Sequence, residues 1–272
     1  MKTQQAIWFV IVTYEPERET LRRLVAALEG WLVMIVDNTQ NQLQTLNFKL
    51  QNEKANVAYI HTGKNLGYAT AGNQGMKAAF DKGAQWVVVC NQDIALVKAG
   101  VGKFANALGR SEPGIIGPEA GTLDPKRWTT ILASRPGLEA RRLDHGIARY
   151  DELSYISGSF MAIHKEVWEA TGGFYEPYFM YYEDADLSMR ARNAGFPLIV
   201  LRLAMRHKEG SNEYYLARNH LLFVERNAPV GVKIHEFLRL TKTLYEYRDR
   251  GNRGAWHGVR DYIMRRFGMK KE

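Results

Sequence analysis

The chain has 272 residues, of which 46% are apolar, and its formal net charge is +8. That apolar fraction can fill a sizeable core, so the composition excludes an intrinsically disordered chain. The single cysteine, Cys90, excludes an intramolecular disulfide, and no window approaches the roughly 20 consecutive apolar residues of a membrane span. The apolar run at residues 6–12 is too short for a signal peptide. We therefore expect a cytoplasmic protein that is soluble or lies on a surface.

The first half of the chain alternates short apolar runs with helical patterns. Strands are predicted at residues 7–12, 31–36, 57–61 and 86–90, and helices at residues 17–28 and 68–82. This alternation is typical of βαβ units in a doubly wound, mainly parallel sheet flanked by helices. The sequence thus predicts an α/β fold of the Rossmann-like kind.

The second half is less regular. Residues 111–149 show no clear period and are rich in Gly and Pro. One strand is predicted at residues 155–164, with Gly158 inside it, followed by helices at 167–171 and 184–194 and a strand at 197–201. After Glu213 the pattern is helical to the end, which predicts a C-terminal helical extension.

Polar residues follow the carboxyl ends of the predicted strands. In a parallel sheet, ligands bind outside the carboxyl ends of the strands, so these residues are expected to surround a site. There is no GxGxxG after the first strand and no GxxxxGK[ST], which argues against a dinucleotide site or a P-loop. The residues at the strand ends are Thr13, Tyr14, Asp37, Asn38, Lys64, Asn65, Asn91, Gln92 and Asp93.

Asp93 and His207 are candidate metal ligands. An acidic side chain at a strand end suits a hard cation such as Mg²⁺ or Mn²⁺, which would neutralise a diphosphate. His207 follows the strand at 197–201, and a neutral imidazole there would complete the coordination. The alternatives are a turn residue in the polar loop after residue 90 and an ordinary loop histidine.

An acidic cluster, Glu183, Asp184 and Asp186, opens the helix at 184–194. Carboxylates in a first helical turn are favourable to the helix dipole, which is reason enough for their presence. However, the preceding residues 174–182 are dense in aromatics, which commonly face sugar rings and lower the polarity around a carboxylate. Such a carboxylate would suit a general base acting on an acceptor hydroxyl, unless the aromatics are simply core.

Together these stretches resemble the family-2 glycosyltransferases of the GT-A fold, especially bacterial rhamnosyltransferase-like and galactofuranosyltransferase-like members. The resemblance runs from about residue 7 to about residue 225. It rests on the order and spacing of several short motifs, each weak alone. They are Val10-Ile11-Val12-Thr13-Tyr14, Val36-Asp37-Asn38, Asn65-Leu66-Gly67-Tyr68-Ala69 with Gly72-Asn73, Asn91-Gln92-Asp93, Ser157-Gly158-Ser159-Phe160 and Tyr182-Glu183-Asp184-Ala185-Asp186-Leu187.

The resemblance implies a role for each matching residue on the donor side. Thr13 and Tyr14 would lie at the nucleotide, partly through backbone groups, and Asp37 would recognise its base. Lys64 and Asn65 would flank the nucleotide and diphosphate. Gly67 and Gly72 would allow close backbone approach, and Asn91, Gln92 and Asp93 would complete the donor site.

The same resemblance implies the chemistry. Asp93 matches the last acid of the DXD metal motif, and His207 resembles a histidine that binds the same metal. Asp184 matches the catalytic base of a single inverting displacement, with Glu183 and Asp186 orienting the acceptor or the base. Asn91 stands where the motif has its first acid; it brings no charge, so weaker metal binding is expected.

The expected substrates are a nucleotide-sugar donor, linked to dTDP, UDP or GDP, and a glycan or lipid-linked saccharide acceptor in cell-surface polysaccharide synthesis. Rhamnose is the sugar that the resemblance favours. We divide the chain into a catalytic domain, residues 1–225, and a basic amphipathic helical tail, residues 226–272. The nucleotide-binding half of the domain covers about residues 1–110 and the acceptor half about residues 111–225.

The charge is concentrated in the tail. Residues 233–272 hold 11 Lys and Arg against 5 Asp and Glu, which leaves +6 of the net +8. Apolar residues recur at helical spacing within 232–247, so an anionic membrane surface is one expected partner. The alternative is that these helices pack on the catalytic domain with their cations solvated.

Three other functions fit the sequence less well than glycosyl transfer does. A non-catalytic nucleotide-sugar-binding or scaffold subunit would be expected to lack the base or the metal acid, yet Asp184 and Asp93 are both present. Nucleic-acid binding is suggested by charge alone, without a recognisable module, so no nucleic-acid partner is expected. A nucleotidyltransferase would need a triphosphate loop rich in Gly and Lys near the first strand, and none is present.

Overall fold

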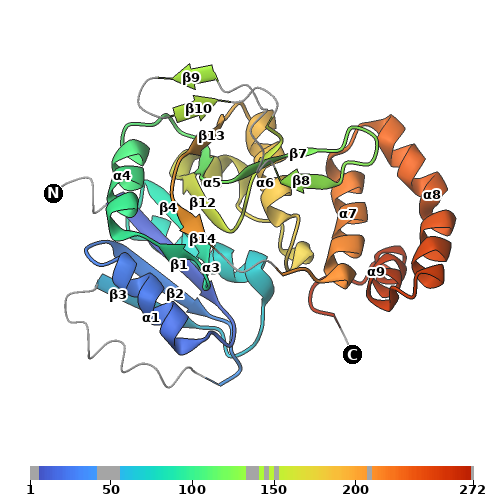
Figure 1. Ribbon diagram of the computed structural model, residues 1–272, viewed down its shortest axis with the longest axis horizontal. Helices are drawn as coiled ribbons and strands as arrows, with labels where there is room; N and C mark the ends of the chain where they lie inside the picture. Colours follow the sequence, from blue (N-terminus) through green and yellow to red (C-terminus); the bar gives the residue numbers. More distant parts are fainter. Residues whose placement is uncertain are drawn as a thin grey trace.

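The computed structural model describes residues 6–41, 56–132, 141–143, 147–149, 153–206 and 210–270. Its centre is a nine-stranded sheet in the order β3-β2-β1-β4-β12-β6-β13-β10-β9 (Figure 1). The strands are β1 (Ile7–Thr13), β2 (Leu32–Asp37), β3 (Asn56–His61), β4 (Trp86–Asn91), β6 (Ile115–Gly117), β9 (Arg141–Leu143), β10 (Ile147–Arg149), β12 (Phe160–His164) and β13 (Leu198–Leu201).

The first four strands are parallel, and their side chains alternate between two apolar cores. On one face Val10 and Val12 pack with α3 (Gly67–Asp81). On the other face Phe9 and Ile11 pack with α1 (Arg18–Ala27) and α4 (Lys98–Leu108). Because both faces are covered, the strands read as continuous apolar runs rather than as alternating ones. The predicted three-layer α/β arrangement is confirmed.

Cys90 lies inside this sheet as a fully buried thiol on β4, packed in the core that α1 and α4 cover. Burial, together with the negative charge of nearby Asp93, raises the pKa of the thiol to about 12. The thiol therefore packs in the sheet as a small apolar group.

The predicted strand at residues 155–164 is wrong as a single element. It forms two strands in different sheets: β11 (Tyr155–Ile156) pairs with β7, whereas β12 pairs with β4 and β6. The chain changes sheets at Ser157, Gly158 and Ser159. Gly158 permits a close approach here, because a Cβ on it would lie only 3.1 Å from the Cβ of Asp184.

Residues 111–149 are also more regular than predicted. They include β6, β9 and β10 of the large sheet, together with β7 (Ala120–Leu123) and β8 (Thr130–Leu132). With β11, these last two form a separate three-stranded antiparallel sheet. Strands of three or four residues are too short to show a hydrophobic period, so the pattern of apolar residues did not predict them. A two-stranded sheet joins β5 (Ala95–Leu96) to β14 (Met205–Arg206).

Helices complete the second half. α5 (Lys165–Thr171) and α6 (Glu183–Asn193) join the α3 side of the sheet through Val167 and Leu187, and the 3₁₀ turn η3 (Glu176–Tyr178) lies between them. α7 (Glu213–Asn227), α8 (Val230–Asp249) and α9 (Arg253–Ile263) form the helical extension on one side of the molecule (Figure 1).

The division of the chain at residue 225 stays a prediction, and that residue lies within α7. Among the residues that the structure describes, no helix is both long and apolar enough to cross a membrane.

Candidate active site

The polar strand ends meet along one edge of the sheet, as the parallel order requires. Thr13 at the end of β1 is paired in register with Asp37 at the end of β2, and Asn91 at the end of β4 is paired with Val12. Asp37 is fully buried, and its carboxylate accepts hydrogen bonds from the backbone N–H and the hydroxyl of Thr39, at 3.0 and 2.7 Å, and from the hydroxyl of Tyr59. The loop that follows β2 is thereby fixed beside the strand ends.

Gln92 and Tyr14 are held together by two reciprocal hydrogen bonds. The backbone N–H of Tyr14 donates to Gln92 Oε1 at 2.7 Å, and Gln92 Nε2 donates to the carbonyl of Tyr14 at 3.0 Å. The Tyr14 amide expected at the nucleotide is therefore already bonded within the protein. Its side chain remains 44% exposed, so it is the ring that is accessible to a ligand.

The loop between β3 and α3 carries Lys64 and Asn65. Lys64 is exposed, and Asn65 Oδ1 accepts a hydrogen bond from the N–H of Gly67 at 3.0 Å, which satisfies one free donor at the start of α3. Asn38 ties the same loop to β2, since its Nδ2 donates to the carbonyl of Gly67 at 3.2 Å. Of these side chains, Lys64 is the one that stays open to solvent at this edge of the sheet.

Two of the three glycines of α3, Gly67 and Gly72, lie against the protein's own side chains. We expected Gly67 and Gly72 to admit a ligand, but the atoms next to them belong to the aromatic segment, residues 174–182. A Cβ on Gly67, whose φ is +82°, would collide with the ring and carbonyl of Phe179, and a Cβ on Gly72 would lie 3.0 Å from the ring of Phe174. Both glycines therefore make room for the protein's own aromatic residues.

A cavity of about 470 Å³ lies between this edge of the sheet and the acidic cluster. Asn91 at the end of β4, the turn at Ser157, Gly158 and Ser159, and the carboxylates of Glu183 and Asp184 all line it. Its volume is in the range that small-molecule sites occupy. The remaining lining residues are Tyr68, Thr130, Leu132, Tyr155, Met180, Tyr181, Tyr182, Gly210 and Leu216.

Asp184 is held rigidly in the wall of this cavity. Its Oδ2 accepts a hydrogen bond from the N–H of Gly158 at 2.8 Å, and its Oδ1 accepts one from the N–H of Ala185 at 2.8 Å. Burial raises the pKa of the Asp184 carboxyl, although these N–H donors act in the opposite direction. The result is a fixed carboxylate with a raised proton affinity, which is what a general base needs.

Glu183 lies beside it, only 5% exposed, and its Oε2 has no hydrogen-bond partner within the described part of the chain. Burial, and then the charge of Asp184, raise the pKa of Glu183 well above its ordinary value. Glu183 thus lines the cavity as a buried carboxyl with a raised pKa, and its Oε2 is closed to solvent.

Asp186 was expected on the acceptor side, but it does not line the cavity. It is fully buried, and its carboxylate accepts hydrogen bonds from Arg190, Arg226 and Asn227 at 2.7, 2.9 and 2.9 Å. Burial alone would raise the pKa of Asp186, but the charges of Arg190 and Arg226 outweigh it and lower the pKa. Asp186 therefore joins α6 to α7, and its role is structural.

The aromatic segment reaches the acidic cluster through an unusual backbone. Phe179, Tyr181 and Tyr182 all have positive φ, at +68°, +65° and +71°, a region that bulky residues rarely adopt. The conformation brings Tyr181 and Tyr182 to the cavity wall directly before Glu183. Some other interaction must compensate for the strain.

Two neighbouring residues of α7, which the sequence interpretation missed, supply that interaction. Asn219 Nδ2 lies 2.8, 2.6 and 3.0 Å from the carbonyl oxygens of Tyr178, Met180 and Tyr181, to which it donates. Arg218, fully buried, donates to the carbonyls of Tyr178 and Gly268 at 2.9 and 2.6 Å. A cation on an otherwise apolar helix face was the one signal in the sequence that pointed to this pair.

The structure tests only part of the metal prediction. Asp93 is half-buried and makes no hydrogen bond or ion pair with the residues described, and its charge raises the pKa values of the nearby Tyr68 and Cys90 after the larger effect of burial. Within the described ranges no group of three or more His, Cys, Asp or Glu side chains could hold an ion. His207 lies outside the described residues.

Two solved structures with a similar fold hold a nucleotide or a nucleotide sugar. GalNAc-T7 with UDP, GalNAc and Mn²⁺ matches with a TM-score of 0.65 at 15% identity, covering 81% of this chain but only 47% of that one. Residues 1–349 of S. aureus TarS in complex with UDP-GlcNAc match with a TM-score of 0.58 at 14% identity, covering 95% and 80% of the two chains. The fold is therefore the GT-A fold.

A family model, in addition to the fold, defines the class: the protein is a glycosyltransferase. The model of the glycosyl transferase family 2 matches residues 8–172, and the chain belongs to that family.

Two relatives from bacteria are named for rhamnose. The dTDP-rhamnosyl transferase RfbF of Shigella flexneri is 27% identical over 255 residues, which cover 85% of this chain and 84% of the relative. The N-acetylglucosaminyl-diphospho-decaprenol L-rhamnosyltransferase of Mycobacterium tuberculosis is 29% identical over 219 residues, with coverage of 69% and 70%.

Proposed function

We propose that this chain transfers rhamnose from dTDP-rhamnose, with inversion, to a hydroxyl of a glycan or lipid-linked saccharide. The observation that carries the proposal is the Asp184 carboxylate, held in the wall of the 470 Å³ cavity with a raised pKa. The names of both relatives support rhamnose as the sugar.

The reaction needs one base and one displacement. Asp184 accepts the proton of the acceptor hydroxyl while the acceptor oxygen forms a bond to the anomeric carbon. The bond from that carbon to the diphosphate breaks, and the nucleoside diphosphate leaves with the electron pair. Glu183, which lines the same cavity, would orient the acceptor or the base.

A panel of donors tests the substrate assignment. The full chain is incubated with dTDP-rhamnose, UDP-GlcNAc, UDP-galactofuranose or GDP-mannose and a polyprenyl-diphosphate-linked GlcNAc acceptor, and the products are identified by mass spectrometry. We expect one added deoxyhexose with dTDP-rhamnose. Transfer from another donor alone would refute rhamnose as the sugar, and no transfer from any donor would refute the acceptor class.

Asp93 and His207 would hold the divalent cation, with the amide oxygen of Asn91 as a further ligand. The oxygen donors of Asp93 and Asn91 fit Mg²⁺ or Mn²⁺, and the carboxylate of Asp93 has no competing partner within the described residues. When bound, the ion would neutralise charge on the diphosphate. Thr13, Tyr14, Asp37, Lys64, Asn65 and Gln92 remain our proposal for the donor side.

The metal proposal predicts opposite effects for two neighbouring substitutions. Asn91→Asp adds a charged oxygen ligand and should tighten Mn²⁺ binding in the presence of dTDP by about tenfold. Asp93→Asn removes the only charged ligand of the pair and should weaken it by about 100-fold. Calorimetric titration of Mn²⁺ measures both without turnover. Equal affinities for the three proteins would place the metal elsewhere.

We also propose that the chain works at the cytoplasmic surface of an anionic membrane. The +6 excess in residues 233–272 supports this placement, because juxtamembrane cations are attracted to acidic lipids. A lipid-linked acceptor would be presented at the same surface.

A further inference from the structure

Helix α8 exposes several large apolar side chains. Its two buried residues are polar, Glu236 and Thr243, and its apolar residues Leu240, Leu244 and Tyr247 are partly buried against α7 and α9. Phe237 and Leu238, in contrast, are each 72% exposed. Packing within this chain therefore gives no reason for the exposed apolar residues, and large exposed apolar surfaces commonly mark interaction sites. The exposed apolar residues are Val230, Ile234, Phe237, Leu238 and Tyr245.

These five residues lie on one side of the helix. At about 100° per residue they fall within an arc of about 100°, together with Thr241. We call this set the outer face of α8. The helix runs along the margin of the molecule, on the side away from the central sheet (Figure 1). The outer face is therefore continuous and accessible.

An ion pair with a buried carboxylate supports this orientation. Glu236 Oε1 lies 3.2 Å from Arg127 Nε, in the connection between β7 and β8; Glu236 is only 3% exposed, whereas the Arg127 side chain is 35% exposed. Rotating the helix to bury its exposed apolar side chains would break this pair and present a different face to Arg127. The buried Glu236 carboxylate would then lose its cation, which is unfavourable. The exposure of the outer face is thus part of the native packing.

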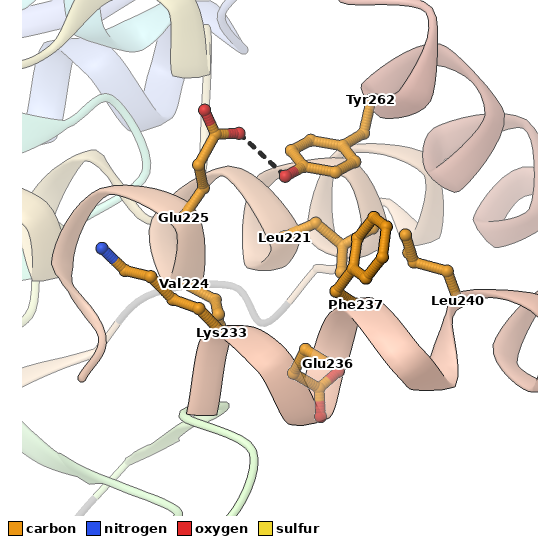
Figure 2. A pocket seen from close by; sticks show the side chains of 8 residues that line it. All are labelled: Leu221, Val224, Glu225, Lys233, Glu236, Phe237, Leu240 and Tyr262. Carbon is orange, nitrogen blue, oxygen red and sulfur yellow. Dashed lines mark hydrogen bonds between the residues drawn. The ribbon is translucent and has the colours of Figure 1, made fainter. Parts of the chain in front are cut away.

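A small apolar hollow of about 190 Å³ continues the outer face toward α7 and α9. Phe237 and Leu240 lie beside Leu221 and Tyr262 there, with Lys233 at the other end (Figure 2). The Tyr262 hydroxyl donates to Glu225 at 2.8 Å, so the polar groups of this hollow are paired among themselves. The hollow extends the apolar surface without adding an unpaired acid.

The charges around the outer face select its partner. Lys242 and Lys233 flank the arc on either side, and Arg248 continues it at the C-terminal end. A second copy docked about a twofold axis would bring these cations together, which is unfavourable. An anionic surface would instead be complementary to them. Each margin of the arc holds one lysine, and Asp249 lies beside Lys242, so the face keeps a net positive charge. Apolar side chains bordered by cations are typical of helices that lie in a membrane interface.

We propose that the outer face of α8 docks on an anionic lipid bilayer, with Phe237 and Leu238 inserted at the level of the headgroups. This proposal deepens the membrane placement given above and rests on it. It names the surface that makes contact, and it leaves the cavity at Asp184 outside the contact.

Flotation of the full chain with vesicles tests the surface. Vesicles of phosphatidylcholine containing phosphatidylglycerol should bind the protein, and vesicles of phosphatidylcholine alone should not. Replacing both Phe237 and Leu238 by serine should weaken binding by about tenfold for each side chain lost. Val97→Ser is the matched control, since Val97 is 61% exposed on the catalytic side. Lys242→Glu should weaken binding by about fivefold or more, and Lys103→Glu should not.

Wild-type binding by the serine double variant, or no flotation of the wild type, would overturn the proposal. A concentration-dependent dimer in sedimentation, lost in the double variant, would also overturn it and make the face an interface between copies. Transfer to a water-soluble acceptor analogue should be unaffected by the double substitution. If flotation behaves as expected but no donor supports transfer, the surface stands and the proposed reaction fails.

Discussion

Asp184→Asn should reduce sugar transfer by about 10²–10⁴-fold while the dissociation constant for dTDP changes by less than about twofold. The amide has the shape of the carboxylate, and its oxygen can still accept the hydrogen bond from Gly158; its Nδ2 then faces the N–H of Ala185, which loses its acceptor. The amide cannot accept the proton of the acceptor hydroxyl. Initial rates and a nucleotide titration measure the two quantities separately.

Asp81→Asn is the matched control, because Asp81 is an exposed acid paired with Lys77 on α3. It should keep wild-type turnover. Glu183→Gln should lose less than Asp184→Asn, since burial already favours the protonated form of Glu183. Turnover of Asp184→Asn equal to that of the wild type would show that the base is another group.

The same assignment sets the pH dependence. As the pH is lowered, the base becomes protonated and the rate falls. Because the pKa of Asp184 is raised, this fall should already occur at a pH above about 3.9, the usual pKa of an aspartate. The acidic limb of kcat/KM for the wild type reports this pKa. An acidic limb at or below the usual value would contradict the raised pKa.

Asn219→Ala should lower kcat by about 100-fold and leave the KM for the donor nearly unchanged. The substitution removes the donor shared by three carbonyls. The carbonyl of Tyr178 keeps its hydrogen bond from Arg218, whereas those of Met180 and Tyr181 lose the one from Asn219, and each buried carbonyl left unpaired costs about 1–3 kcal/mol. Tyr181 and Tyr182 would then leave their positive-φ conformations, and the residues just before Asp184 would shift. A displacement of about 1 Å at a catalytic group is enough for such a loss.

Asn252→Ala provides the comparison for this second prediction. Asn252 Oδ1 accepts a hydrogen bond from the N–H of Ala255 at the start of α9, so its loss should destabilise the helical extension by about 1 kcal/mol. Its kcat should remain that of the wild type. Thermal unfolding and initial rates are measured on both variants. If Asn219→Ala is destabilised but keeps its kcat, the residue supports the fold and not the catalytic geometry.

The sequence predicted best where the chain repeats one local pattern. The strands β1 to β4 are apolar runs ended by polar residues, and both faces of each are covered, so their periodicity alone identified them. The prediction from periodicity failed at residues 155–164, because no local signal shows that β11 and β12 pair with different strands. Only the sheet topology separates them.

The acidic cluster shows the same limit at the site. Asp184 and Asp186 are the same type of residue in the same helical turn, yet Asp184 faces a cavity and Asp186 faces two arginines. The difference depends on Arg226 and Asn227, about forty residues away in sequence, which reach Asp186 from α7. The strained backbone before the cluster depends on the same helix, through Asn219. Motif spacing therefore identified the candidate base but not the scaffold that places it.

The position of Cys90 gives the protein an internal reporter. The thiol lies at the centre of the sheet, and its pKa of about 12 leaves almost no thiolate at neutral pH. Alkylating reagents such as iodoacetamide should therefore leave the native protein unmodified and label it only as the sheet opens. Since the chain holds a single cysteine, the rate of labelling counts openings of β4 directly. The stability of every variant described above can thus be read from one reaction, without introducing a label.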